Sequence, residues 1–369
     1  GSGIAVGVTA GLQFLPMLLF GAWGGAIADR HNKRRLLLLT QTLQTIGPLT
    51  LLGLAITGTV PPVAVFAVVL FRGAVNAVDY PTRQAFVSEI VGRDRVVNAV
   101  SLNSVLVHSS RIAGPAIAGI LIATVGTAPC FALNAASFVV MIVALAGMDT
   151  AALRPPKPVA RRPGAIREGL AYVRRSPSLW VPLALMAIVG TFGFNFQALL
   201  PLLADKSFGA GASGYALLVS AMGAGAIVGA LTTGARNHVS SSLLVAAAAA
   251  FGVLAFVASA APTLALMAIA VVPLGASTVT LAASINSGLQ LAAEPSMRGR
   301  VMALYSVVFL GSTPIGAPLT GWLCDAVDPR AALVMAGASG LIGAGLARVA
   351  FDRANSVTLS HLSMPQVET

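Results

Sequence analysis

The chain has 369 residues, of which 56% are hydrophobic and only 9% are charged. Soluble domains carry about 25% charged residues, so this composition excludes an ordinary water-soluble fold and favours a protein surrounded by lipid. The formal net charge is +11. The basic residues lie between apolar runs and form no single basic face, which argues against nucleic acid as a partner.

Apolar runs long enough to cross a lipid bilayer as helices recur along the whole chain. We count eleven, with approximate bounds 4–28, 36–57, 61–79, 97–125, 129–148, 179–203, 213–234, 243–260, 263–290, 301–323 and 330–350. The sequence therefore predicts an all-α membrane protein with many spans.

The connections between these spans form two alternating sets that differ in Lys and Arg content. One set holds 19 of the 23 Lys and Arg residues, the opposite set holds only Lys206 and Arg330, and Arg72 and Arg111 lie inside spans. Cytoplasmic connections are enriched in Lys and Arg. We therefore expect Gly1 outside the cell and the C-terminus in the cytoplasm.

The central connection, residues 149–178, begins as a proline-rich basic segment. It then places Ile166, Leu170 and Val173 at intervals of four and three residues, with arginines on the other faces. This spacing predicts a short helix on the cytoplasmic membrane surface. A solvated basic tether is the alternative.

The segments on the two sides of this connection resemble each other at offsets of 202 to 205 residues. The matches pair Gly25-Ala26-Ile27 with Gly229-Ala230-Leu231, Arg95-Val96-Val97 with Arg300-Val301-Met302, and Pro115 and Gly119 with Pro318 and Gly321. A nearly constant offset indicates a duplication. We expect an N-terminal bundle over 1–148, a linker over 149–178, a six-helix C-terminal bundle over 179–350 and a cytoplasmic tail over 351–369. The second bundle's first span has no counterpart in the first, so we expect one helix to be missing from the front.

The first charged connection, GGAIADRHNKRR, is similar to the signature loop of the major facilitator superfamily, which reads roughly G-x-x-x-D-R-x-x-x-R-R. The matching positions are Gly25, Asp29, Arg30, Arg34 and Arg35. Asn32 stands where the family usually has Gly, and the repeated loop has Thr233 in place of the acid.

Later segments extend this resemblance over essentially the whole chain. SSRIAGPAIAGIL is similar to a fifth-span pattern of the family's antiporters, which Gly114, Pro115 and Gly119 occupy. DYPTRQAFVSEIVG and RGRVMALYSVVFLGSTPIGAPLTGWL resemble the branch that includes enterobactin exporters and macrolide or tetracycline efflux proteins. The resemblance implies the major facilitator fold, two six-helix bundles of which eleven helices are present.

The resemblance also implies a function in transport. We expect a secondary active exporter of amphipathic small molecules, either drugs or siderophores, that works by alternating access and proton antiport. It would use the proton gradient and no cofactor, and would sit as a monomer in the inner membrane of a bacterium. An inactive truncated fragment and a transporter of another small solute are the alternatives.

Enzyme and pump classes find no support in the motifs. The chain contains no H-E-x-x-H or G-x-S-x-G segment, no pair of acids at mid-membrane and no phosphate-binding loop of the G-x-x-x-x-G-K-[ST] type. We expect no catalytic residue, no metal site and no ATP-driven transport.

Charged and polar residues inside spans are costly and mark candidate pathway residues. Arg72, Asn76 and Asp79 recur at one face of a predicted span. Arg72 would attract an anionic group of the substrate or lower the pKa of a nearby carboxylate. The alternative is a structural arginine bonded to carbonyl groups of neighbouring helices.

Five further residues are candidates for the substrate or proton pathway: His108, Arg111, Asn195, Gln197 and Asn286. Hydrogen bonding between helices is the alternative for the amides, and a structural role is the alternative for His108. The acids lie near span ends or in loops, so the proton carrier would be Asp79, His108 or, as we favour, a group on the missing helix.

The signature loop suggests a conformational latch. The family resemblance places Asp29 at the N-terminus of the helix near Val301, where the helix dipole favours an acid. Arg30 or Arg34 could pair with Asp79. We expect Gly25, Asp29, Arg30, Arg34 and Asp79 to form a latch that holds the outward-open state. A second set serves close packing or bending of helices: Gly114, Pro115, Gly119, Pro318 and Gly321.

Overall fold

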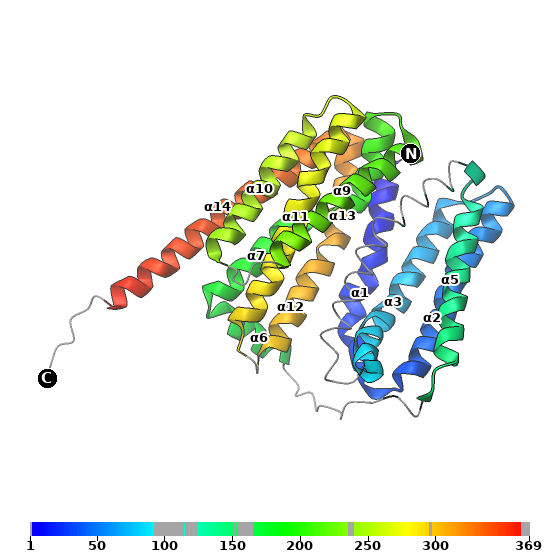
Figure 1. The fold of residues 1–369 in the computed structure, drawn as a ribbon, viewed down its shortest axis with the longest axis horizontal. Helices are drawn as coiled ribbons and strands as arrows, with labels where there is room; N and C mark the ends of the chain where they lie inside the picture. The colour runs from blue at the N-terminus through cyan, green and yellow to red at the C-terminus, as the bar shows by residue number, and fades with distance from the viewer. Residues whose placement is uncertain are drawn as a thin grey trace. The chain divides into compact units, whose positions relative to one another are not determined.

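The computed structural model describes residues 2–91, 124–150, 165–234, 240–294 and 297–362, together with positions 114, 118, 121 and 153. Within these ranges the regular elements are helices, and none is a strand (Figure 1). The predicted all-α class is therefore confirmed.

Ten helical segments of the described residues are long and apolar enough to cross a membrane. They correspond to ten of the eleven predicted spans, and the remaining one, 97–125, falls almost wholly outside the described residues. The bounds are α1 Gly3–Arg30, α2 Lys33–Ile56, α3 Pro62–Val91, α5 Ala128–Ala146, α7 Pro177–Phe192, α8 Phe196–Leu202, the π-helical η3 Leu203–Ser207, α9 Gly211–Gly234, α10 Ser241–Ser259, α11 Leu264–Ala292, α12 Arg298–Gly311, α13 Thr313–Ala326 and α14 Pro329–Leu362.

Two predicted spans are interrupted. The span predicted at 179–203 is divided into α7 and α8, and the span predicted at 301–323 is divided into α12 and α13 at Ser312. Pro314 lies in the first turn of α13, where a missing N–H removes no hydrogen bond from the helix.

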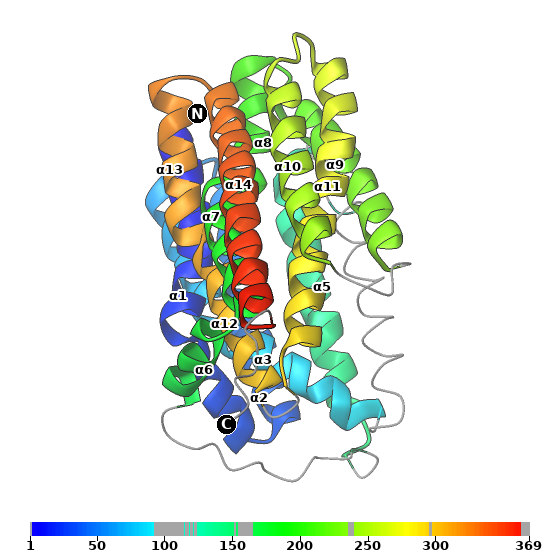
Figure 2. The ribbon, with the colours of Figure 1, turned by 90° about the vertical axis from the view of Figure 1, so that its left-hand side faces the viewer.

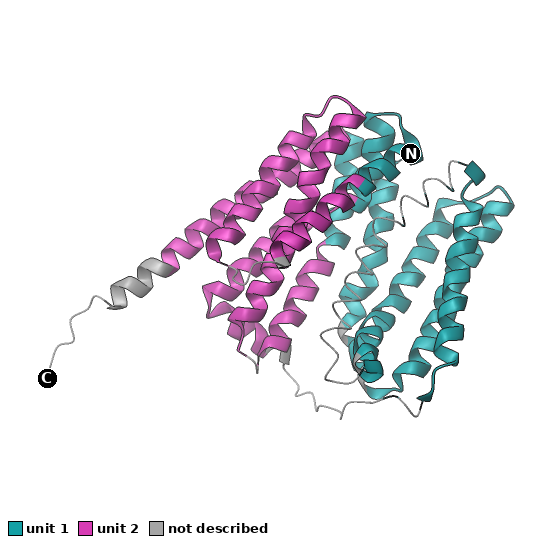
Figure 3. Ribbon diagram, viewed as in Figure 1, with its two compact units in different colours: residues 1–160, 197–220, 313–326 teal, residues 161–196, 221–312, 327–369 magenta. Residues whose placement is uncertain are grey.

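The chain forms two compact units, which do not follow the order of the sequence (Figure 3). The first comprises residues 1–160, 197–220 and 313–326, and the second comprises 161–196, 221–312 and 327–369. In the first unit α1 packs along both α3 and α13. In the second, α10 runs beside α14 (Figure 2).

Glycines let the helix backbones of each unit approach closely. In the first unit, a Cβ at Gly24 of α1 would collide with the carbonyl oxygen of Ala77 of α3. In the second, a Cβ at Gly225 of α9 would collide with the carbonyl of Val272 of α11, and one at Gly229 would collide with that of Ala276. Helices in lipid associate mainly through such close packing.

The helix predicted within the central connection is present as α6, Ala165–Arg174. Glu168 of α6 forms an ion pair with Arg300 of α12, and the Tyr172 Oη accepts the backbone N–H of Glu294 at 3.1 Å. These contacts attach α6 to the cytoplasmic ends predicted for α11 and α12. Its location on the membrane surface stays a prediction.

Candidate functional site

A cavity of about 430 Å³ lies in the first compact unit between α1, α8 and α9. Its walls are Val6, Thr9, Ala10, Gln13, Gln197 and Tyr215. Ligand pockets of proteins enclose about 300–1,000 Å³, so the cavity has room for a small molecule. Four of its wall side chains are polar and uncharged, and two are aliphatic.

The α1 wall of the cavity follows from helical spacing. Val6, Thr9, Ala10 and Gln13 lie three or four residues apart and so share one face of α1. Ala10 also forms a buried cluster with Ala198 of α8, next to Gln197, and with Ala317 of α13, and Val6 packs against this cluster. The Thr9 hydroxyl donates to the carbonyl of Ala5 at 2.7 Å, which leaves its oxygen able to accept from a ligand.

The helix break that precedes Gln197 is built around a buried asparagine. Residues 193–195 separate α7 from α8. The Asn195 Nδ2 donates to the carbonyl oxygen of Thr191 at 2.7 Å, which satisfies a carbonyl that the break would leave unpaired. The Asn195 Oδ1 is buried and has no partner among the described residues.

Aromatic packing accounts for the position of the break. A Cβ at Gly193 would lie 2.9 Å from the ring of Phe251. The rings of Phe194 and Phe196 meet that of Phe251 edge to face, with centroids 5.3 and 6.4 Å away. Interrupted helices form the substrate sites of many secondary transporters, and here the cavity residue Gln197 follows the interruption in sequence.

Of the predicted pathway residues that the structure describes, Gln197 lines the cavity, whereas Arg72, Asn76, Asn195 and Asn286 are not among its lining residues. Asn286 accepts a hydrogen bond from Gln290 at 2.6 Å. His108 and Arg111 lie outside the described residues.

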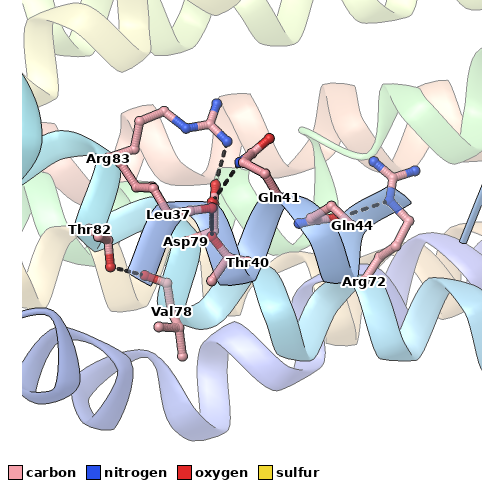
Figure 4. A network of polar contacts seen from close by, with 9 residues as sticks. All are labelled: Leu37, Thr40, Gln41, Gln44, Arg72, Val78, Asp79, Thr82 and Arg83. Atoms are coloured by element: carbon pink, nitrogen blue, oxygen red, sulfur yellow. Dashed lines mark hydrogen bonds and ion pairs between the residues drawn. The ribbon is translucent and has the colours of Figure 1, made fainter. Parts of the chain in front are cut away.

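Arg72 lies on α3, partly buried against α2 (Figure 4). Its Nε donates to the Gln44 Oε1 at 3.4 Å, and no carboxylate in the described part of the chain forms an ion pair with it. Its hydrogen-bond partner is therefore a side-chain amide of the neighbouring helix, where the structural alternative expected backbone carbonyls.

Asp79 is fully buried on the same helix and forms a separate network (Figure 4). Its carboxylate accepts from the Thr40 hydroxyl at 2.6 Å and from the Gln41 amide at 2.8 Å, and it pairs with Arg83 one turn further along α3. Among the described residues, the partners of this carboxylate thus come from α2 and α3.

The predicted pairing of Arg34 with Asp79 is wrong in this structure. The Arg34 Nε and Nη2 donate instead to the carbonyls of Leu145 and Ala146, at 2.6 and 2.7 Å. These carbonyls lie in the last turn of α5 and receive no N–H from within that helix. Asp79 forms its ion pair with Arg83 instead. Arg30 is exposed.

The remaining predicted latch residues, Gly25 and Asp29, both lie in α1. Gly25 is partly buried, whereas the side chain of Asp29 lies outside what the structure describes. An ion pair that the sequence did not predict joins Lys33 to Glu89 at 2.7 Å, and both side chains are largely buried. The charged connection thus binds α3 through Lys33 and α5 through Arg34.

The predicted packing residues are divided between described and undescribed parts of the chain. Pro115 and Gly119 lie outside the described residues, and Gly114 is helical. Pro318 of α13 faces Gly11 of α1, and a Cβ at Gly321 would collide with the carbonyl of Gly3.

Sequence reasoning missed three polar residues of the cavity wall, Thr9, Gln13 and Tyr215, and the aliphatic Val6 and Ala10. A signal was present for two of them, because Thr9 and Gln13 are polar residues spaced by four within an apolar span. Tyr215 gave no such signal, since tyrosine near a span end is ordinarily an interfacial residue.

The family described as "Transmembrane secretion effector" matches residues 2–369. The chain belongs to this family of major facilitator transporters. Among curated relatives, it is 27% identical to the staphyloferrin A transporter of Staphylococcus aureus over 56% of this chain and 52% of that protein. It is 26% identical to the enterobactin exporter EntS of Escherichia coli over 91% of this chain and 79% of that protein. The chain thus matches about half the length of the first relative.

Solved structures share the fold at low identity. The nucleoside transporter NupG aligns with a TM-score of 0.72 at 12% identity, over 95% of this chain and 91% of that one. A bacterial homologue of the human lysosomal transporter Spinster, inward-facing and unoccupied, gives 0.66 at 14%, over 95% and 88%. The predicted major facilitator fold is confirmed, and these relatives are membrane transporters rather than enzymes.

Proposed function

We propose that the protein exports amphipathic small molecules, siderophores in particular, by alternating access and in exchange for protons. The observation that carries this proposal is the cavity, because α1 precedes the central connection whereas α8 and α9 follow it. Transporters of this superfamily place their substrates at the interface between repeated halves, commonly at interrupted helices.

The cavity wall supports an amphipathic cargo. Gln13, Gln197 and Tyr215 offer hydrogen-bond donors and acceptors without charge, beside the aliphatic Val6 and Ala10. Such a wall suits a molecule with both apolar and hydrogen-bonding surface. The names of the relatives, a staphyloferrin A transporter and an enterobactin exporter, direct the choice of cargo to siderophores first.

Proton coupling needs a group that gains and loses a proton during transport. Two buried acids are poorly suited to this role. Asp79 is engaged by Thr40, Gln41 and Arg83, and Glu89 is paired with Lys33. We therefore place the carrier elsewhere in the protein, with His108 as one candidate.

The test is complementation of a bacterium that lacks its own siderophore exporters and drug pumps. We expect the protein to restore secretion of a siderophore, or resistance to a member of a drug panel, and collapse of the pH gradient to abolish either effect. No secretion and no resistance across the panel, with the protein present in the membrane, would contradict the proposal.

A matched pair of glutamine substitutions ties the effect to the cavity. Gln197→Leu removes the amide from the wall, whereas Gln84→Leu removes an exposed amide of α3 that donates to the Tyr80 hydroxyl. We expect export to fall about tenfold in the first, which corresponds to the loss of one hydrogen bond of about 1.4 kcal/mol, and to stay unchanged in the second.

A further inference from the structure

The carboxylate of Asp325, near the end of α13, binds the first turn of α1. It accepts the backbone N–H groups of Gly3 and Ile4 at 2.7 and 2.8 Å and the Ser2 hydroxyl at 3.2 Å. It also forms an ion pair with Lys206. The first N–H groups of a helix have no partner within it and carry partial positive charge, so one carboxylate here satisfies two helical N–H groups and a cation.

Beyond this contact, three glycines of α1 pack closely against α13. Gly3, Gly7 and Gly11 recur every four residues on one face of α1. A Cβ at Gly7 would collide with the carbonyl of Ala317, and one at Gly3 would lie 2.7 Å from the Asp325 carboxylate. Further along, a Cβ at Gly11 would lie 3.1 Å from the ring of Pro318, and Ala10 clusters with Ala317, so the side chains that pack across this glycine seam are small.

The seam and the cavity share α1. Thr9 lies six residues from Gly3, which is about 9 Å along the helix axis at about 1.5 Å per residue. Lys206 belongs to η3, which follows α8 and its cavity residue Gln197. The Asp325 contact therefore joins α1, which lines the cavity, to η3, which continues from the lining segment α8.

The distribution of Lys and Arg predicts this end of α1 on the outer side of the membrane. Lys206 is one of only two basic residues in the connections predicted outside. Its side chain is 28% exposed, and that of Asp325 is 23% exposed. Both residues lie at the surface, so the ion pair alone contributes little, and the N–H groups of α1 carry the larger share of the contact.

We propose that Asp325 is the outer latch of the transport cavity: its carboxylate holds α1 and η3 against α13 and thereby keeps the cavity closed toward the outside. The inference rests on the proposed transport function. Release of cargo to the outside requires that Asp325 give up Lys206 and the two N–H groups of α1, after which the glycine seam can part.

The test measures access to the cavity from outside. Thr9→Cys, in a background carrying Cys130→Ser and Cys324→Ala, is labelled on intact cells with a membrane-impermeant maleimide. We expect Asp325→Asn to raise the labelling rate about tenfold or more. The matched control is Asp328→Asn, since the Asp328 carboxylate accepts the N–H of Arg330, two residues away in sequence, and we expect no change there.

A charge exchange separates the ion pair from the helix cap. Lys206→Asp with Asp325→Lys restores opposite charges, but a lysine accepts no hydrogen bond from Gly3 or Ile4. We expect labelling to stay fast in the exchanged protein. Lys206→Met removes the ion pair and keeps the hydrogen bonds from Asp325 to α1, so we expect the labelling rate to rise about threefold. If the Asp325→Asn protein does not reach the membrane, the Lys206→Met protein takes its place in the comparison.

Equal labelling rates in the Asp325 and Asp328 variants, or a slow rate in the exchanged protein, would overturn the latch. The labelling needs no cargo, so its outcome is independent of the export assay. If the protein exports no compound but Asp325→Asn speeds labelling, the latch stands and the proposed function is wrong. If the protein exports a compound but Asp325→Asn leaves the labelling rate unchanged, the function stands and the latch is wrong.

Discussion

Arg34 donates its Nε–H to the carbonyl oxygen of Leu145 at 2.6 Å, and its Nη2 reaches the next carbonyl, of Ala146, at 2.7 Å. The last carbonyls of a helix have no partner within it and favour a nearby cation. An arginine of the charged connection after α1 thus caps the C-terminus of α5. In this structure its contacts are those of a stabilising cap.

Substituting Arg34 by Met should therefore lower stability. Hydrogen bonds from a charged donor contribute about 1.5–3 kcal/mol, so we expect a clear fall in the unfolding temperature of the detergent-purified protein. Arg35→Met removes the same charge from an exposed neighbour and should leave the unfolding temperature nearly unchanged. Equal shifts in the two variants would assign the effect to charge alone.

Asp79→Leu should be more costly. Thr40, Gln41 and Arg83 would all lose their common acceptor in a buried position. The Arg83 side chain is 54% exposed, so the main cost falls on the buried Thr40 and Gln41, each of which would lose its acceptor at about 1–3 kcal/mol. The control is Asp352→Leu in α14, whose pair with Arg348 is exposed on both sides and is worth less than about 1 kcal/mol. Thermal unfolding followed by size-exclusion chromatography compares the two, and similar losses would contradict the assignment.

Gly225→Ala tests the close packing of α9 on α11. The added methyl would collide with the carbonyl of Val272, and overpacking of this kind costs about 1–3 kcal/mol. At Gly345 of α14 a Cβ would meet no atom within 4 Å. Gly345→Ala should therefore stabilise the protein, by about 0.5–1 kcal/mol. Measured shifts of the same sign would argue against the packing explanation.

Asn195→Ala removes the amide that satisfies the Thr191 carbonyl at the helix break. We expect the break to lose its geometry and export of the cargo to fall about tenfold, the equivalent of about 1.4 kcal/mol. Asn134→Ala on α5, away from the cavity wall, is the control and should export normally. Unchanged export by the Asn195 variant would show that the break does not position Gln197.

Asp29→Asn tests the latch predicted on the opposite, cytoplasmic side. We expect the variant to insert normally and to shift the balance of conformations toward the inward-open one. The reason is that asparagine carries no negative charge to interact with the positive end of the helix near Val301. Thiol labelling from the cytoplasmic side measures the shift. Normal transport together with unchanged accessibility would rule this latch out.

Much of the fold could be predicted because a membrane span is a local property. Ten of the eleven predicted spans have counterparts among the described helices. The errors come from contacts beyond the span: the predicted span at 179–203 is interrupted where Gly193 approaches the ring of Phe251 in α10. No pattern within the span itself announces a contact with a distant helix.

The candidate site shows the same division. Gln197 could be selected from sequence because a polar residue in an apolar run is conspicuous, and it lines the cavity. Thr9 and Tyr215 could not be selected in this way, since they join Gln197 in one cavity wall only when α1 and α9 pack beside α8. Arg34 was recognised as important, but the choice between Asp79 and the carbonyl of Leu145 depends on where α5 ends in space.

By itself, the sequence determined the helical class, the approximate spans and the family, because lipid selects apolar segments by length and composition, whatever their neighbours are. Only the tertiary structure decided which polar groups meet. The Asp325 carboxylate reaches the N–H of Gly3 across 322 positions of the chain. Such a pair forms only when two helices lie side by side, and it is this packing that turns isolated polar residues into a cavity and a latch.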